Sequence, residues 1–174
     1  MARGHIMSVC NDKAIAELMD AQVTFLDALR QGLPTLRLLT ERIDRESYRR
    51  DEAAHYEPGL PLAVALPSTV DEVAGIMRLA TKYRVPVVPR GAGTGLSGGS
   101  AGIEGALTIA LTRLNRILEI DRANLVAIVE PGVINADLKA AVAEEGLFYP
   151  PDPASYEMCS IGGNIGTNAG ACAA

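Results

Sequence analysis

The stretch PRGAGTGLSGGS, residues 89–100, follows the apolar run VPVV of residues 85–88 and contains five glycines. Glycine adds nothing to packing and loses much conformational entropy on folding, so a cluster of it indicates a backbone that turns sharply or approaches another group. Residues 89–105 and 162–170 together hold 11 of the 17 glycines of the chain. Loops this rich in glycine are uncommon and usually functional. We therefore interpret both stretches as ligand-binding loops rather than ordinary surface loops, with a phosphate as the first candidate ligand.

The glycine spacing distinguishes between kinds of phosphate loop. Residues 93–98 match the G-x-G-x-x-G dinucleotide fingerprint, but that fingerprint needs a helix to begin inside it, and SGGSAGIEG (residues 97–105) cannot start one. A P-loop is excluded because no Lys-Ser or Lys-Thr pair closes the spacing. We expect a helix-free loop joining two strands of one sheet, whose backbone N–H groups bind the anion with the hydroxyls of Thr94 and Ser97. Arg90 either adds a charge to this site or is a solvated arginine at a strand end.

Short apolar runs on both sides of the loop predict strands. They cover residues 62–67, 85–89, 106–111, 116–120 and 125–132. A helical pattern separates the first two strands, which predicts a βαβ unit. The last two strands are separated by the polar turn DRAN and are expected to pair as a hairpin.

Three helices are predicted around these strands. The helix between the first two strands begins with Thr69 and Glu72 at capping-box spacing. Its expected apolar face consists of Val73, Ile76, Met77 and Ala80. A second helix is expected over residues 11–30, with a stop at Gly32. The third is expected over residues 135–146, with Asn135 as its cap and Gly146 as its stop.

Composition limits the class of protein. The chain has 174 residues, of which 48% are hydrophobic, and a mean hydropathy of +0.15, which suits a globular domain with a buried core. Its 21 acidic and 16 basic residues leave a net charge of −5, so no nucleic-acid partner is expected. Three cysteines without C-x-x-C or metal-ligand spacing predict neither a disulfide framework nor a metal site. We expect a cytoplasmic protein, with peripheral attachment to a membrane left open for a longer form.

Four motifs carry a resemblance to a known family. In order they are PVVPRGAGTGLSGGS, VAIVEPGV, YPPDPAS and SIGGNIGTNAG. Together they resemble the FAD-binding domain of flavoproteins with the vanillyl-alcohol-oxidase (PCMH-type) fold, and within it the branch of the glycolate oxidase FAD subunit and D-lactate dehydrogenase. The resemblance implies an α+β PCMH-type domain over residues 59–174, its first α/β subdomain complete and its second only begun. An N-terminal helical segment, residues 8–58, precedes it, and residues 1–7 look like a tag remnant.

The resemblance also implies which residues contact FAD. The loop after residue 89 would wrap the pyrophosphate, and the later motifs would lie along the flavin and ribityl chain. In full, the implied contacts are Arg90, Gly91, Ala92, Gly93, Thr94, Gly95, Leu96, Ser97, Gly98, Gly99, Pro131, Gly132, Pro151, Asp152, Pro153, Ala154, Ser155, Ser160, Ile161, Gly162, Gly163, Asn164, Gly166, Thr167, Asn168 and Ala169. Gly162 and Gly163 would let backbone amides approach flavin oxygens. FAD is expected to be bound non-covalently, because Thr94 stands where covalently linked relatives carry a histidine.

The activity implied by the resemblance is oxidation of a 2-hydroxy acid, of the glycolate or D-lactate type, to the 2-oxo acid by hydride transfer to flavin N5. The alternatives are a sugar-lactone oxidase, an enolpyruvyl-sugar reductase of the same fold, or a non-catalytic FAD- or nucleotide-binding module. The downstream electron acceptor is not identified. The sequence stops inside the second glycine stretch, so we expect the 174 residues alone to bind FAD weakly or not at all, to show no turnover, and to form a homo-oligomer through unpaired strand edges.

A few other polar residues have competing interpretations. Asp152 is either an acid of the site or a residue that stabilises its turn. Cys159 is expected to be a small buried side chain near the cofactor, and His55 an exposed residue. No catalytic residue is named, because the family's substrate-facing residues come from later segments.

Overall fold

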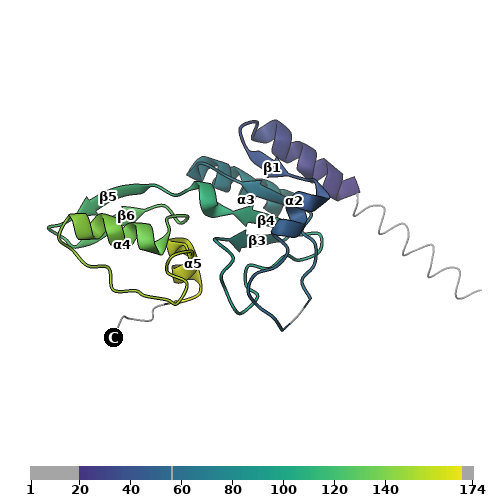
Figure 1. Ribbon diagram of the computed structural model, residues 1–174. Helices are drawn as coiled ribbons and strands as arrows, with labels where there is room; N and C mark the ends of the chain where they lie inside the picture. Colours follow the sequence, from purple (N-terminus) through teal and green to yellow (C-terminus); the bar gives the residue numbers. More distant parts are fainter. Residues whose placement is uncertain (1–19, 56, 170–174) are drawn as a thin grey trace, which may run out of the picture.

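The computed structural model describes residues 20–55 and 57–169. They form two lobes of mixed α/β structure (Figure 1). The first lobe contains a four-stranded sheet in the order β1-β2-β4-β3. Its strands are β1 (Arg37–Leu39), β2 (Ala63–Leu66), β3 (Val87–Arg90) and β4 (Leu107–Ala110). β2, β4 and β3 run parallel and β1 is antiparallel to β2, so β4 lies between the two strands of the predicted βαβ unit.

Both faces of this sheet are covered. Ala63, Ala65, Leu107 and Ile109 alternate along β2 and β4 and face a core shared with Phe25 and Leu29 of the helix over residues 20–32 and with Ile76 and Ala80 of α3 (Val70–Tyr83). On the other face, Val64, Leu66 and Ala110 pack with Leu39 and Tyr48, which follows α2 (Arg42–Ser47). β2 and β4 are therefore buried along their whole length.

The predicted start of α3 is confirmed. Thr69 is its N-cap, and the Thr69 hydroxyl accepts a hydrogen bond from the Glu72 N–H at 3.1 Å. Burial raises the pKa of Glu72, but hydrogen bonds from Ser68 and Thr35 outweigh it, so the pKa lies below its ordinary value of 4.5. The prediction that Met77 lies on the apolar face is wrong. The buried face is rotated toward Glu72 and Ile76, which leaves Met77 44% exposed.

The N-terminal helix ends at Gly32, as predicted. Residues 11–19 of its predicted range lie outside the described residues.

The second lobe combines a hairpin with two helices. Its elements are β5 (Ile117–Asp121), β6 (Val126–Val129), α4 (Asn135–Glu144) and α5 (Ile161–Gly166), and the 3₁₀ turn η1 (Leu111–Arg113) connects the lobes. The antiparallel pairing of β5 with β6 confirms the predicted hairpin. Gly146, with φ of +71°, ends the helical segment as predicted. The prediction that Asn135 caps α4 is wrong: Ile134 is the N-cap, and Asn135 is fully buried with its Nδ2 donating to the Pro151 carbonyl at 3.3 Å.

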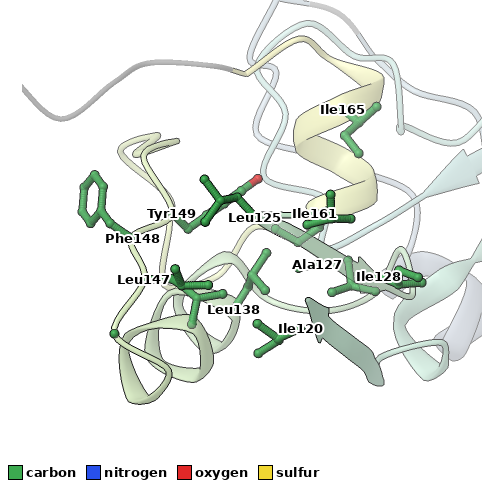
Figure 2. A pocket seen from close by; sticks show the side chains of 14 residues that line it. Ile120, Leu125, Ala127, Ile128, Leu138, Leu147, Phe148, Tyr149, Ile161 and Ile165 are labelled. Carbon is green, nitrogen blue, oxygen red and sulfur yellow. The ribbon is translucent and has the colours of Figure 1, made fainter. Parts of the chain in front are cut away.

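An apolar cavity of about 770 Å³ lies in the second lobe. Figure 2 shows Leu138 of α4, Ile161 of α5 and the hairpin residue Ile120 around it. The lining is almost entirely aliphatic and aromatic, which makes this cavity a poor match for a phosphate. In the part of the chain that the structure describes, no helix is long and apolar enough to cross a membrane, and no group of three potential metal ligands is found.

Candidate functional site

A cleft of about 890 Å³ lies between the two lobes. One wall is the loop that follows β3, and the other is built from α5, the segment before it, and Pro131 after β6. Figure 1 shows the loop after β3 and α5 facing each other across the gap between the lobes. Segments about 70 residues apart in the sequence thus meet at one site.

The structure places most of the predicted cofactor contacts in this lining. Those that line the cleft are Arg90, Gly91, Ala92, Gly93, Thr94, Gly95, Leu96, Ser97, Gly99, Pro131, Pro153, Ala154, Ser155, Ser160, Gly162, Gly163, Asn164, Gly166, Thr167 and Ala169. The predicted residues outside the lining are Gly98, Gly132, Pro151, Asp152, Ile161 and Asn168. Six lining residues are not among the predicted contacts: Pro89, Ser100 and Cys159, each next to a predicted contact in the sequence, and Glu52, Leu111 and Met158, which the sequence did not indicate. Nothing in the local sequence distinguishes Glu52, because its place depends on a contact made far along the chain.

Packing explains several of the residues that lie outside the lining. Ile161 is turned into the core of the second lobe and is 5% exposed. Gly132 lies against the carbonyls of Leu111 and Leu114 so closely that a Cβ there would overlap both. Asp152 accepts a hydrogen bond from Lys139 Nζ on α4, which supports its interpretation as a residue that holds its turn.

The loop between β3 and β4 contains no helix, and the two strands are parallel neighbours, as predicted. Gly93 has φ of +83°, and a Cβ at Gly93 would overlap the Arg90 guanidinium. Gly95, in contrast, has no atom within 4 Å of the position a Cβ would take. The two glycines therefore have different roles: Gly93 is required by the loop itself, whereas Gly95 leaves an open backbone surface in the cleft.

Arg90 is held inside the loop. Its side chain is 8% exposed, its Nη1 donates to the Ser100 carbonyl at 3.1 Å, and its guanidinium lies 5.7 Å from the centre of the Tyr48 ring. Burial lowers the pKa of Arg90, while the nearby Asp51 and Tyr48 raise it in part. The interpretation as a solvated strand-end arginine is therefore wrong. Among the described residues, Arg90 Nε and Nη2 have no hydrogen-bond partner, so the guanidinium retains donors for an anion in the cleft.

The wall opposite contains α5, a helix that the sequence did not predict. Ser160 is its N-cap and accepts a hydrogen bond from the Gly163 N–H at 3.3 Å. The Gly162 N–H donates to the Pro131 carbonyl at 2.8 Å, and a Cβ on Gly162 would lie 2.6 Å from Pro131 Cβ. The interpretation of Gly162 and Gly163 as glycines with amides free for a ligand is therefore wrong. Gly162 permits close packing of α5 on Pro131. The helix was not predicted because glycine has a poor helix propensity.

Asn164 of α5 is a second residue with a donor that has no partner in the described part of the chain. It lines the cleft, is 6% exposed, and its Nδ2 has no hydrogen-bond partner among the described residues. An unpaired buried amide is costly, so a ligand acceptor in the cleft would stabilise it. Cys159 is 4% exposed and free, as predicted for a small buried side chain. His55 is exposed, also as predicted.

Glu130 positions the turn that carries Pro131. Its carboxylate accepts hydrogen bonds from the Arg116 side chain at 2.7 and 3.1 Å and from the Arg116 N–H at 2.8 Å. These bonds hold the pKa of Glu130 below its ordinary value of 4.5. The hydrogen bonds between Arg116 and Glu130 fix the end of β6, and they therefore fix the position of Pro131 at the cleft.

Comparison with known proteins bears on this site. A family model described as "FAD binding domain" matches residues 61–174. The glycolate oxidase subunit GlcD of Bacillus subtilis is 47% identical over 123 residues, which cover 71% of this chain and 26% of that protein. A D-2-hydroxyglutarate dehydrogenase of Xanthomonas citri is 45% identical over 143 residues, covering 82% of this chain and 30% of that protein. The 4-ethylphenol oxidase structure from Gulosibacter chungangensis superposes with a TM-score of 0.73 at 27% identity, covering 83% of this chain and 28% of that one. The chain thus spans less than a third of the length of these proteins.

Proposed function

Because this chain belongs to the FAD-binding-domain family, we propose that its inter-lobe cleft holds FAD non-covalently and that the protein of which it is part oxidises a 2-hydroxy acid. Homologous FAD-linked oxidoreductases named glycolate oxidase, D-2-hydroxyglutarate dehydrogenase and D-lactate dehydrogenase support this substrate class. The chemistry that FAD would supply when bound is acceptance of the hydride from the hydroxyl-bearing carbon, while the hydroxyl proton passes to a base or to solvent and the substrate becomes the 2-oxo acid. The residues of this chain bind and orient the cofactor.

The observation that carries the proposal is the loop after β3. Its backbone is open at Gly95 and Gly99, and Arg90 lies within it with two donors, Nε and Nη2, that have no hydrogen-bond partner among the described residues. A pyrophosphate would bind to these donors and to the loop N–H groups. The hydroxyls of Thr94 and Ser97, both in the lining, extend this donor set. Thr94 also supports non-covalent binding, since an unactivated hydroxyl forms no bond to the flavin.

The opposite wall would hold the ring system. Pro131, Pro153 and Ala154 give it a rigid apolar surface, and the Asn164 amide offers a donor to the acceptor atoms of a flavin. We assign a catalytic role to none of the described residues.

Binding of FAD can be measured even if it is weak. In ¹H–¹⁵N spectra of the labelled chain, we expect FAD to shift the amide resonances of Gly91–Gly99 and of the 162–169 segment. Riboflavin, which lacks the pyrophosphate, is the matched control and should leave the Gly91–Gly99 amides unshifted. If FAD shifts the 162–169 segment but not Gly91–Gly99, or if riboflavin shifts the first segment as much as FAD does, the proposed position of the pyrophosphate is wrong.

The substrate class is tested on the flavin-loaded full product of the gene. Under anaerobic conditions we expect D-lactate, glycolate or D-2-hydroxyglutarate to bleach the flavin absorbance, and L-lactate serves as the control of the opposite configuration. A flavin that is bound but bleached by none of these acids would favour a non-catalytic binding module or another substrate class.

A further inference from the structure

A short segment outside the family-matched region lies against the glycine loop. Residues 48–52, YRRDE, follow α2 and precede the family match that begins at residue 61. We call these five residues the strap. The strap lies beside the loop between β3 and β4, and its last residue, Glu52, lines the cleft.

Backbone hydrogen bonds tie the strap to the loop at two points. The Gly102 N–H donates to the Arg49 carbonyl at 2.8 Å, and the Glu52 N–H donates to the Gly95 carbonyl at 3.1 Å. Just beyond the strap, the Gly59 N–H donates to the Gly102 carbonyl at 2.9 Å. The loop therefore has its far side paired with a segment that comes about 50 residues earlier in the chain.

Side chains close a second set of contacts around Arg90. The Tyr48 ring lies 5.7 Å from the Arg90 guanidinium, and Arg90 Nη1 donates to the Ser100 carbonyl. Ser100 in turn directs its N–H and hydroxyl at Asp51 Oδ2, each at 3.4 Å. Tyr48 thus contacts Arg90 directly, and Asp51 holds Ser100, whose carbonyl accepts the hydrogen bond from Arg90.

The loop needs such external support. A glycine-rich segment loses more backbone entropy on ordering than any other, and no regular structure orders residues 91–106 internally. If nothing else held it, the ligand would have to order the loop on binding, and its affinity would fall accordingly.

We propose that the strap is part of the cofactor site: Tyr48 and Asp51 are positioning residues that hold the glycine loop, and Arg90 within it, in an anion-binding shape before the ligand arrives. The identity of the ligand rests on the proposed function, whereas the support of the loop does not. The two parts are tested separately below.

The first test separates strap and loop without a ligand. In Gly102→Ala the new Cβ would lie 2.5 Å from the Gly59 carbonyl oxygen and 2.9 Å from Pro61 Cδ, so the loop should shift at Gly102 and lose its hydrogen bond to the Arg49 carbonyl of the strap. Gly99→Ala is the matched control, because a Cβ there has no atom within 4 Å. We expect hydrogen exchange of the Glu52 amide to accelerate about tenfold in Gly102→Ala and to stay unchanged in Gly99→Ala. Unchanged exchange in Gly102→Ala would overturn the proposal. If that variant does not fold, Tyr48→Leu takes its place in the same measurement.

The second test uses FAD as the probe. Tyr48→Leu keeps an apolar side chain against Val64 and Leu66 but removes the aromatic face beneath Arg90, whereas Tyr48→Phe keeps that face. We expect FAD affinity to fall about fivefold in Tyr48→Leu and to be retained in Tyr48→Phe, with equal melting temperatures. Equal affinity in all three proteins, or equal loss in both variants, would overturn the positioning role of Tyr48. The parent in this test is the full product of the gene. Absence of FAD binding to it would instead refute the proposed function and leave the exchange test intact.

Discussion

Replacing Gly93 with valine is expected to weaken FAD binding roughly a hundredfold or more. A β-branched residue at φ of +83° is strained by about 1–3 kcal/mol, and its Cβ would also overlap the Arg90 guanidinium. The loop would have to rearrange or expel Arg90, and either change removes donors that the pyrophosphate needs. The measurement is the titration of the flavin-free full product of the gene, and of its Gly93→Val variant, with FAD, followed through the flavin fluorescence.

Gly95→Val is the control that shows whether the loss of FAD affinity in Gly93→Val comes from a changed conformation of the loop. The sequence assigns the two glycines the same role, but the structure gives a Cβ at Gly95 open space and no positive φ. We therefore expect the ligand-free spectrum of Gly95→Val to keep the parent loop resonances, and that of Gly93→Val to lose them. A parent-like ligand-free loop in Gly93→Val, with FAD affinity within about twofold of the parent, would refute the role assigned to Gly93.

Phe25→Ala is expected to lower the free energy of unfolding by about 3–5 kcal/mol. Phe25 is fully buried, packs with Leu29 and Ile76, and contacts the Tyr83 ring with centroids 5.9 Å apart. Removing its ring would leave a cavity between the helix over residues 20–32 and α3. A loss of this size is a large part of the stability of a small domain.

Urea denaturation followed by circular dichroism gives the measurement, and Val23→Ala is the control on the same helix. Val23 is 60% exposed, so its truncation should change the unfolding free energy by less than about 0.5 kcal/mol. If Phe25→Ala is as mild as Val23→Ala, the helix over residues 20–32 is not part of the core. That result matters for the boundary of the domain, because the helix also lies outside the family match.

The sequence was informative wherever a feature depends on nearby residues. The Thr69–Glu72 cap, the hairpin of β5 and β6, and the stop at Gly146 were all predicted and all occur. Each depends on backbone geometry within a few positions, which residue type controls directly. The predictions failed at Asn135 and Met77, where packing against another element decides which side chain is buried.

The candidate site shows the same division. The prediction that the loop after β3 contains no helix and joins two strands of one sheet is confirmed, and it excludes the helix that a dinucleotide fingerprint needs. Glycine content led to a wrong prediction at Gly162, where the absence of a Cβ makes room for Pro131 and not for a ligand.

By itself, then, the sequence determined strands β2 to β6, helices α3 and α4, the helix-free loop and, through four motifs, the FAD-binding family, but not β1, α2 or α5. Only the tertiary structure decided that β4 separates β2 from β3, that Arg90 is buried against Tyr48, and that the strap is paired with the glycine loop. The physical reason is the distance along the chain over which each feature is set. Dihedral preferences and capping act between neighbours, whereas the strap and loop meet across about 50 residues, and no local spacing encodes such a contact.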